Sequence, residues 1–355
     1  MSIQTDSLQK QKTVAYWLLI GVFMVIIQII IGGVTRLTGS GLSITEWQPI
    51  LGIIPPISEQ DWLEAFEKYK GIAQFSKINY DYTLSDFKFI YFWEWFHRLW
   101  GRTLGVVFAI PFVYFIIKKY FTKEMIFPLV LLFILGGLQG LIGWIMVKSG
   151  LNDTNIYVSH IRLAIHFNTA LILLVYTYWF ALKLLIPKED RITQPPLRWL
   201  LLSILGILVI QLFYGSFMAG LHAGAAAPSW PDINGKFIPN TFPSESWIND
   251  RLNVQFIHRM LAYILVILII WMFMKLRTLM KENSSNLSLK RALVWPVVFV
   301  VLQVTLGIMA VLTSTTVVRG HFGTFEFIAE LHQIVALFLV LSLVRMLYIV
   351  NKTAQ

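Results

Sequence analysis

The chain has 355 residues, of which 57% are hydrophobic and only 14% are charged. This composition exceeds what the core of a soluble domain can absorb, so it excludes an ordinary soluble protein and indicates an integral membrane protein. The net charge of +10 does not indicate nucleic-acid binding, because the basic residues stand in short segments beside apolar stretches, and the absence of cysteine excludes disulfides and thiolate metal sites.

Eight apolar stretches are long enough to cross a bilayer, since a helix needs about 20 apolar residues to cover roughly 30 Å of hydrocarbon. They lack the period-two alternation of a barrel, so helices are the remaining way to satisfy their backbone groups in lipid. We predict an all-α integral membrane protein with eight transmembrane helices. The expected spans are residues 14–34, 89–117, 126–147, 160–186, 198–219, 252–276, 292–313 and 327–349.

The first 13 residues lack the arginine-rich character of a transit peptide and lead into the first span without a small-residue cleavage site. Lysine and arginine gather at one set of alternate helix ends, from Lys10 and Lys12 to Arg345 and Lys352. The positive-inside rule then places both termini in the cytoplasm. We expect a multi-pass protein of the bacterial plasma (inner) membrane rather than of the mitochondrial inner membrane.

The longest connection between spans, residues 35–88, falls on the side opposite to the termini. Its first part, residues 35–43 (TRLTGSGLS), is dense in glycine and serine and predicts a folded turn on the outer face. Residues 58–70 have the spacing of a short amphipathic helix, which we expect to lie at the interface.

A Gln-x-x-x-Gly pattern recurs in the odd-numbered spans. The spacing places both residues on one helix face, where glycine permits close approach of another helix and glutamine can hydrogen-bond to it. We interpret them as packing residues that mark the register of an internal duplication, with halves at residues 1–190 and 191–355. The pairs are Gln28/Gly32, Gln139/Gly143, Gln211/Gly215 and Gln303/Gly307.

The even-numbered spans carry histidines near their outer ends. His97 corresponds to His258 in the duplication, and His166 corresponds to His332. Four spans per copy is an even number, so we predict two parallel-repeat four-helix bundles with all four imidazoles in the outer leaflet. Polar residues in lipid are costly, and imidazoles from two facing helices can hold a haem iron between them. We therefore predict that His97 pairs with His166, and His258 with His332.

Three arginines stand near the outer interface, where a guanidinium can pair with a haem propionate. Arg98 and Arg259 each directly follow a predicted ligand, and Arg162 stands one turn before another. Interfacial snorkelling is the alternative. We predict cofactor binding by all three, with Arg162 the weakest candidate, and we interpret the outer histidines His160, His222 and His321 as solvated loop residues.

Glu94 distinguishes the two halves, because the equivalent position holds Gln255. It precedes His97 by about one turn, so its carboxylate projects near the same metal centre. A buried carboxylate can accept a proton or stabilise developing positive charge. We predict that the first half carries out chemistry and the second holds a resident cofactor. The alternative is that Glu94 only orients the imidazole or pairs with Arg98.

Taken together, these residues resemble the haem A synthase family over nearly all eight spans. The absence of cysteine resembles the branch found in alphaproteobacteria and mitochondria, whereas residues 222–231 and 313–328 depart from the family pattern and leave the outer cover of the second site open. The resemblance rests on residues 32–43 (GGVTRLTGSGLS), the Glu94-x-x-His97-Arg98 motif, residues 158–166, residues 254–259 and Leu331-His332-Gln333.

The resemblance implies a haem-dependent oxidoreductase that converts haem O to haem A by oxidising the C8 methyl to a formyl group, for use in cytochrome c oxidase. His97 and His166 would then bind the substrate haem iron, with Glu94 at the reacting region. His258 and His332 would ligate a resident haem b. The implied partners are haem O delivered by a haem O synthase, an unidentified electron donor and the lipid bilayer, and a homo-oligomer is left open.

Two other functions remain open from the residues alone. In an electron-transfer di-haem cytochrome b, both histidine pairs would hold permanent haems, although Glu94 then has no counterpart in the second half. In a parallel-repeat transporter, the histidines would form a proton relay and the purified protein would be colourless.

Overall fold

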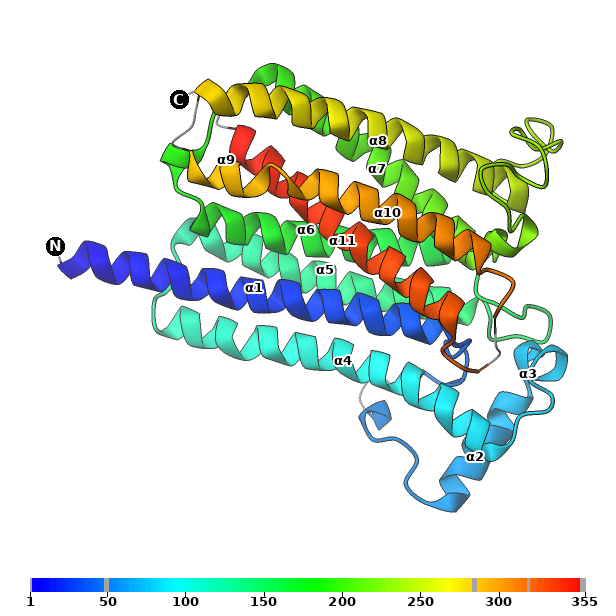
Figure 1. Ribbon diagram of the computed structural model, residues 1–355. Coiled ribbons are helices and arrows are strands. Elements are labelled where there is room, and N and C mark those ends of the chain that lie inside the picture. The colour runs from blue at the N-terminus through cyan, green and yellow to red at the C-terminus, as the bar shows by residue number, and fades with distance from the viewer. Residues whose placement is uncertain (1, 48–50, 283–285, 318–319, 352–355) are drawn as a thin grey trace.

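The computed structural model describes residues 2–47, 51–282, 286–317 and 320–351. Within these ranges the regular structure is helical apart from two isolated bridges, and eight helices are long and apolar enough to cross a membrane (Figure 1). The predicted all-α membrane protein with eight spans is thus confirmed. The spans are α1 (Ser2–Leu37), α4 (Leu84–Ile117), α5 (Lys123–Lys148), α6 (His160–Leu185), α7 (Pro195–Gly220), α8 (Arg251–Glu282), α10 (Trp295–Leu312) and α11 (Thr324–Val350).

Several helix boundaries differ from those expected, and two of the differences have a clear local cause. The first helix begins at Ser2, well before residue 14, because its polar start contains neither proline nor glycine and a formed helix gains a hydrogen bond for each residue added. The seventh span is preceded by a separate short helix, α9 (Leu287–Ala292). Pro296 lies in the first turn of α10, where its missing N–H leaves no helical hydrogen bond unmade.

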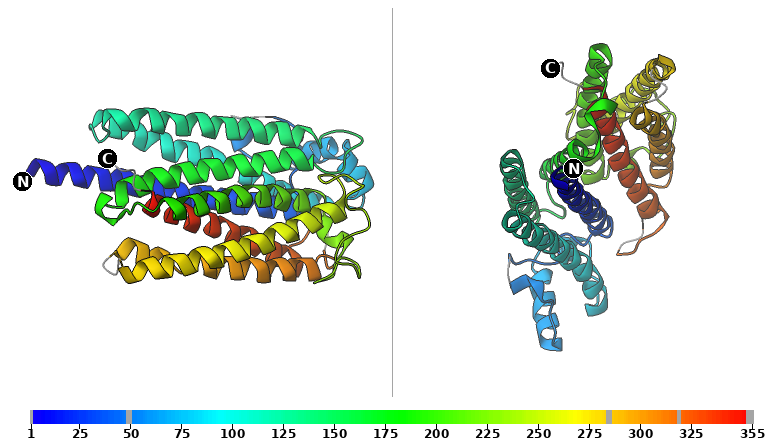
Figure 2. Two further views of the ribbon diagram at one scale, coloured as in Figure 1. Left: turned by 90° about the horizontal axis from the view of Figure 1, so that it is seen from above. Right: turned by 90° about the vertical axis from the view of Figure 1, so that its left-hand side faces the viewer.

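Four helices form the centre of the bundle, and each carries one flanking helix. Helices α1, α6, α7 and α11 contact one another in a ring, while α4 packs on α1, α5 on α6, α8 on α7 and α10 on α11. The end-on view in Figure 2 shows α1 and α11 in the middle, with α4 and α5 on one side and α8 and α10 on the other. The flanking helices therefore present most of the apolar surface expected to face lipid.

The outer connection between α1 and α4 is folded as expected. The turn after α1 closes through a hydrogen bond between the hydroxyls of Thr38 and Ser40 at 2.6 Å. Helix α2 (Glu59–Lys70) begins after Ser58, which caps it together with Asp61, so the predicted short helix is confirmed. A further short helix, α3 (Ala73–Lys77), follows, and both lie beside the outer end of α4 (Figure 1).

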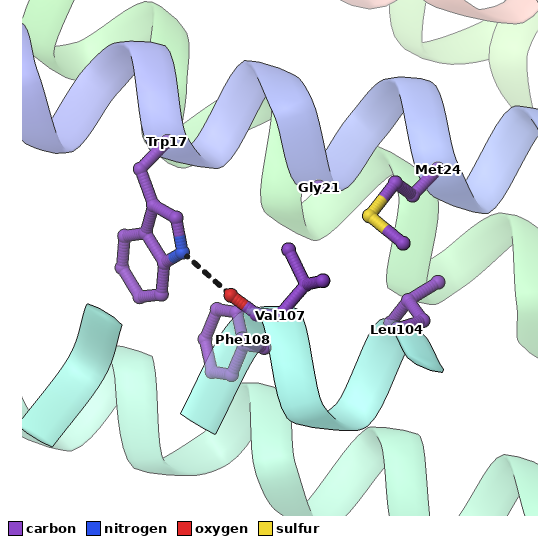
Figure 3. A pocket seen from close by; sticks show the side chains of 6 residues that line it. All are labelled: Trp17, Gly21, Met24, Leu104, Val107 and Phe108. Atoms are coloured by element: carbon purple, nitrogen blue, oxygen red, sulfur yellow. Dashed lines mark hydrogen bonds between the residues drawn. The ribbon is translucent and has the colours of Figure 1, made fainter. Parts of the chain in front are cut away.

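The contact between α1 and α4 away from the histidines is apolar. The Trp17 indole N–H donates to the carbonyl of Val107 at 3.3 Å, and its ring stacks on Phe108 at 4.6 Å (Figure 3). Gly21 and Met24 help to line a cavity of about 20 Å³ beside these rings. Since its lining residues are apolar, this cavity is a packing gap and not a candidate site.

Candidate functional site

The four histidines predicted as ligands lie on α4, α6, α8 and α11. The ring centroids of His258 and His332 are 6.5 Å apart. Two imidazoles that bind one metal ion at bonds of ~2 Å have ring centroids roughly 6 Å apart. This pair therefore has the spacing needed to hold one iron between two rings. His97 and His166 lie within electrostatic range of each other.

Each imidazole lies against a glycine of a neighbouring helix. An added Cβ at Gly32 or Gly143 would lie closer to the ring than real Cβ atoms come, and one at Gly215 or Gly307 would make a contact tighter than nine in ten real Cβ contacts. The distances from such a Cβ to Cε1 of the ring are 2.9 Å for Gly32 and His97, 2.8 Å for Gly143 and His166, 3.3 Å for Gly215 and His258, and 3.0 Å for Gly307 and His332.

A glutamine one turn before each glycine contacts the same ring. These are the Gln-x-x-x-Gly residues that the sequence marks as packing residues, and their contact with the histidines was missed. The shared four-residue spacing was the available signal. The amide nitrogen lies 3.1 Å from Nδ1 and 3.3 Å from Nε2 of His97 for Gln28, 3.1 Å from Nδ1 of His166 for Gln139, 3.4 Å from Nε2 of His258 for Gln211, and 3.2 Å from Nε2 of His332 for Gln303.

These features test whether the site fits a metal group. Neutral imidazoles are suitable axial ligands for haem iron, and ligating histidines are commonly oriented by hydrogen bonds from surrounding groups. The glycine gaps give the rings room, and the amides orient them. The residues present fit two haem irons, one for each pair.

Glu94 is 3% exposed, and both of its carboxylate oxygens are bonded. Oε2 accepts hydrogen bonds from the Ser43 hydroxyl and the Ile44 backbone N–H, each at 2.8 Å. Oε1 forms an ion pair with Arg98 at 2.5 Å. The carboxylate therefore ties the outer turn to α4 one turn before His97, and the pairing of Glu94 with Arg98 that the sequence left open does occur.

Arg98 and Arg259 fasten the outer connections to α4 and α8. Arg98 also donates to the backbone carbonyl of Ile44 at 3.1 Å. Arg259 donates to the backbone carbonyls of Ser229 at 2.8 Å and Asp232 at 2.7 Å. Much of their donor capacity is therefore used within the chain, and propionate binding by these arginines stays a prediction.

Arg162 helps to line an outer cavity of about 850 Å³. Its guanidinium donates to the Ile145 carbonyl at 2.9 Å. Lys148 and Trp144 line the same cavity, with the Lys148 ammonium 5.2 Å above the Trp144 ring. Trp144 directly follows Gly143, the glycine against which the His166 ring lies. This basic cavity therefore lies beside the contact between Gly143 and His166.

The unusual segment 222–231 belongs to a loop that side chains of α8 hold. Gln255, at the position equivalent to Glu94, donates to the Ala227 carbonyl at 2.9 Å. Arg259 holds the carbonyl of Ser229 in the same loop. The nearby Asp232 accepts from the Gly235 N–H and the Ser229 hydroxyl, which hold the pKa of that carboxyl below its usual value. The loop is thus anchored within a turn of His258.

One expectation for the outer histidines is wrong. His160 is not a solvated loop residue, because it begins α6 and packs under Gly220 of α7, where an added Cβ would lie 2.6 Å from the His160 Cβ. Its Nε2 is buried and has no hydrogen-bond partner within the described ranges. His222 and His321 are exposed as expected, and the His222 ring lies 4.4 Å from that of Tyr157.

Residues 15–344 match the family described as "Cytochrome oxidase assembly protein". A protein named heme A synthase from Flavobacterium psychrophilum is 42% identical, covering 88% of this chain and 93% of its own length. Its namesake from Flavobacterium johnsoniae is 39% identical, with 97% and 99% covered. A further heme A synthase, from Nitrosomonas eutropha, is 40% identical, with 86% and 87% covered. The matched residues include all four histidines.

Proposed function

This chain belongs to the cytochrome oxidase assembly family and is a haem A synthase, an enzyme that converts haem O to haem A, and we propose that its two histidine pairs bind two different haems. His97 and His166 bind the iron of substrate haem O. His258 and His332 bind a resident haem b. The observation that carries this proposal is the 6.5 Å spacing of the second pair, together with a glycine and a glutamine against every ring.

The two halves take different roles in this proposal. Residues 1–190 form the half that carries out the oxidation, and residues 191–355 form the half that holds haem b. Support comes from Glu94, whose negative charge lies one turn from His97, while the equivalent Gln255 is neutral. A carboxylate there can accept a proton or stabilise positive charge that develops at the porphyrin edge.

The bound haems supply the redox chemistry, and the chain supplies position and surroundings. The imidazoles hold the irons, and the glycine gaps keep the rings close to the neighbouring helices. Glu94 pairs with Arg98 and is oriented by hydrogen bonds from Ser43 and Ile44. Arg98 and Arg259 hold the outer loops over the two pairs, which restricts the entry of water.

The surroundings of the enzyme follow from the same proposal. The protein spans the bacterial plasma membrane with both termini in the cytoplasm and both haem sites toward the outer face. Haem O would reach it from a haem O synthase, and a resident haem b held by the second pair would receive electrons from a donor outside this chain. The lysines and arginines at the cytoplasmic helix ends support this orientation.

Pigment extraction tests the proposal most directly. The protein is purified from cells that make haem O, and its haems are extracted and separated by chromatography. We expect haem B together with haem O or haem A. Haem B alone at both sites would instead support an electron-transfer cytochrome, and protein without haem would support a transporter.

A further inference from the structure

An uncharged segment of the outer connection between α1 and α4 has exposed aliphatic side chains. No acidic or basic residue occurs between Glu46 and Glu59, where the sequence is WQPILGIIPPIS. In the described part of this segment, the side chains of Ile53, Ile54 and Ile57 are 45%, 66% and 79% exposed. The described residues of the chain therefore leave three large apolar side chains uncovered close together in the sequence.

This segment is fixed to the side of α4. A short 3-10 helix, Leu51–Ile53, contacts α4, and the Trp95 indole N–H of α4 donates to the Ile53 carbonyl at 2.9 Å. In Figure 1 this blue part of the chain lies beside α4, nearer to the middle of the bundle than α2 and α3 are. The isoleucines therefore follow a residue at the level of Trp95, and not at the outer tip of the molecule.

The position of Trp95 in the membrane follows from the other end of α4. The helix ends at Ile117, and the next two residues are Lys118 and Lys119. A helix crosses the hydrocarbon with about 20 residues, so the outer boundary of the hydrocarbon falls near Arg98. Trp95 then lies about one turn outside this boundary, in the interfacial layer where tryptophan is enriched.

The exposed isoleucines continue the lipid-facing surface of α4. Phe92, Val106 and Ile110 are exposed, and their spacing places them on one side of the helix. The Phe92 ring lies 6.1 Å from the ring of Trp95, whose indole holds the Ile53 carbonyl. This continuity with a surface that faces lipid favours lipid, and not a protein partner, as the occupant of the apolar patch.

The backbone of the segment also suits the membrane interface. Pro55 and Pro56 have no N–H, so they bring no backbone donor that lipid would leave without a partner. The Ile53 carbonyl accepts from Trp95. Helix α2, which follows, begins with Glu59 and is highly charged. This change from apolar to charged residues marks the point where the chain returns to water.

We propose that residues 53–57 form a membrane anchor, in which Ile54 and Ile57 enter the lipid leaflet beside α4. Apolar side chains of interfacial segments reach about 5–10 Å into the boundary between headgroups and acyl chains. The anchor holds the connection in which the Ile44 N–H bonds to Glu94, so the membrane helps to fix the outer turn. This inference concerns lipid contact and is independent of which haem each histidine pair binds.

Spin labels on single cysteines measure the lipid contact, because the chain has no cysteine of its own. The full-length protein is labelled at Ile54→Cys or Ile57→Cys and reconstituted in phosphatidylcholine nanodiscs. Power saturation then compares the accessibility of the label to oxygen, which concentrates in lipid, and to a nickel chelate, which stays in water. We expect the ratio of oxygen to nickel accessibility at both positions to be severalfold higher than at Gln60→Cys, an exposed position of α2. Ile110→Cys, on the lipid-facing side of α4, gives the value for lipid.

A charged residue tests whether the contact depends on the isoleucines. Ile54→Asp, added to protein labelled at Ile57→Cys, should lower the ratio to the value found at Gln60→Cys, because a carboxylate is costly in lipid. Gln60→Asp on the same background places the same charge on α2 and should leave the ratio unchanged.

Two results would overturn the anchor. A ratio at Ile54→Cys or Ile57→Cys as low as that at Gln60→Cys would place the isoleucines in water, as a surface left for a protein partner. A ratio that does not change with Ile54→Asp would show that this side chain does not enter lipid. Circular dichroism and gel filtration establish that each variant is folded, and Ile53→Cys is a further label position if one of them is not.

Discussion

At the scale of single residues, the histidines are polar groups placed inside lipid-spanning helices, where an unpartnered polar group is costly. Each histidine lies against a hydrogen-bonding amide and occupies the space that a side chain at the facing glycine would fill. Such surroundings would be superfluous for histidines that only fill the core. They fit rings that must be held in one orientation for a metal.

The second pair provides a direct test of ligand identity. Replacing His258 or His332 with alanine should reduce haem B from about one per chain to nearly none, because one imidazole alone holds the iron poorly. The measurement is the pyridine haemochrome spectrum of purified protein. His321→Ala, at an exposed histidine, should retain haem B. Unchanged haem B in both ligand variants would disprove the assignment.

Two variants distinguish the effect of the Glu94 charge from the effect of its hydrogen bonds to the outer turn. Glu94→Gln keeps the shape and one acceptor oxygen but removes the negative charge, so formation of haem A should fall at least ~100-fold while haem content is kept. Activity is measured by chromatography of the haems formed. Ser43→Ala removes one hydrogen bond to the same carboxylate, worth about 1 kcal/mol, and should remain active. Equal loss in both variants would mean that Glu94 serves only to hold the turn.

At the scale of helices, α1 and α11 approach each other closely at a glycine, and this approach brings the two histidine pairs together. An added Cβ at Gly33 of α1 would lie 2.1 Å from the Glu330 carboxylate of α11, so these helices cross where a side chain is missing. The neighbouring Gly32 faces His97, and Glu330 lies two residues from His332. The crossing of α1 and α11 therefore links the surroundings of the two histidine pairs.

A glycine pair on one helix tests the importance of this close approach. Gly143→Ala would place a Cβ 2.8 Å from the His166 ring, and overpacking of this kind costs about 1–3 kcal/mol. We expect a lower unfolding temperature in detergent and severalfold less retained haem O. Gly140→Ala, one turn earlier on α5, meets no atom within 4 Å among the described residues and should change neither. Equal behaviour of the two variants would show that the gap is not needed.

At the scale of the whole molecule, the four histidines lie near the starts of α4, α6, α8 and α11, at the end of the bundle that carries α2 and α3 (Figure 1). The basic residues concentrate at the opposite end. The orientation proposed from this charge difference determines from which side haem O and electrons reach the enzyme.

The absence of cysteine makes this orientation measurable. A single cysteine in place of the exposed Ser244, in the loop after α7, should react with a membrane-impermeant maleimide in spheroplasts. One in place of the exposed Thr278, at the other end of α8, should react only after the membrane is permeabilised. The reverse pattern would place both histidine pairs on the cytoplasmic side.

The sequence by itself determined the eight helices, the short amphipathic helix and the four aligned histidines. Hydrophobicity, cap residues and hydrogen bonds within a helix are local, so they can be predicted from neighbouring residues. The tertiary structure decided that the glutamines contact the rings, that Glu94 pairs with Arg98 and that His160 packs against Gly220. Most of these contacts join helices that meet only when the chain packs, and no local pattern states which atom faces which.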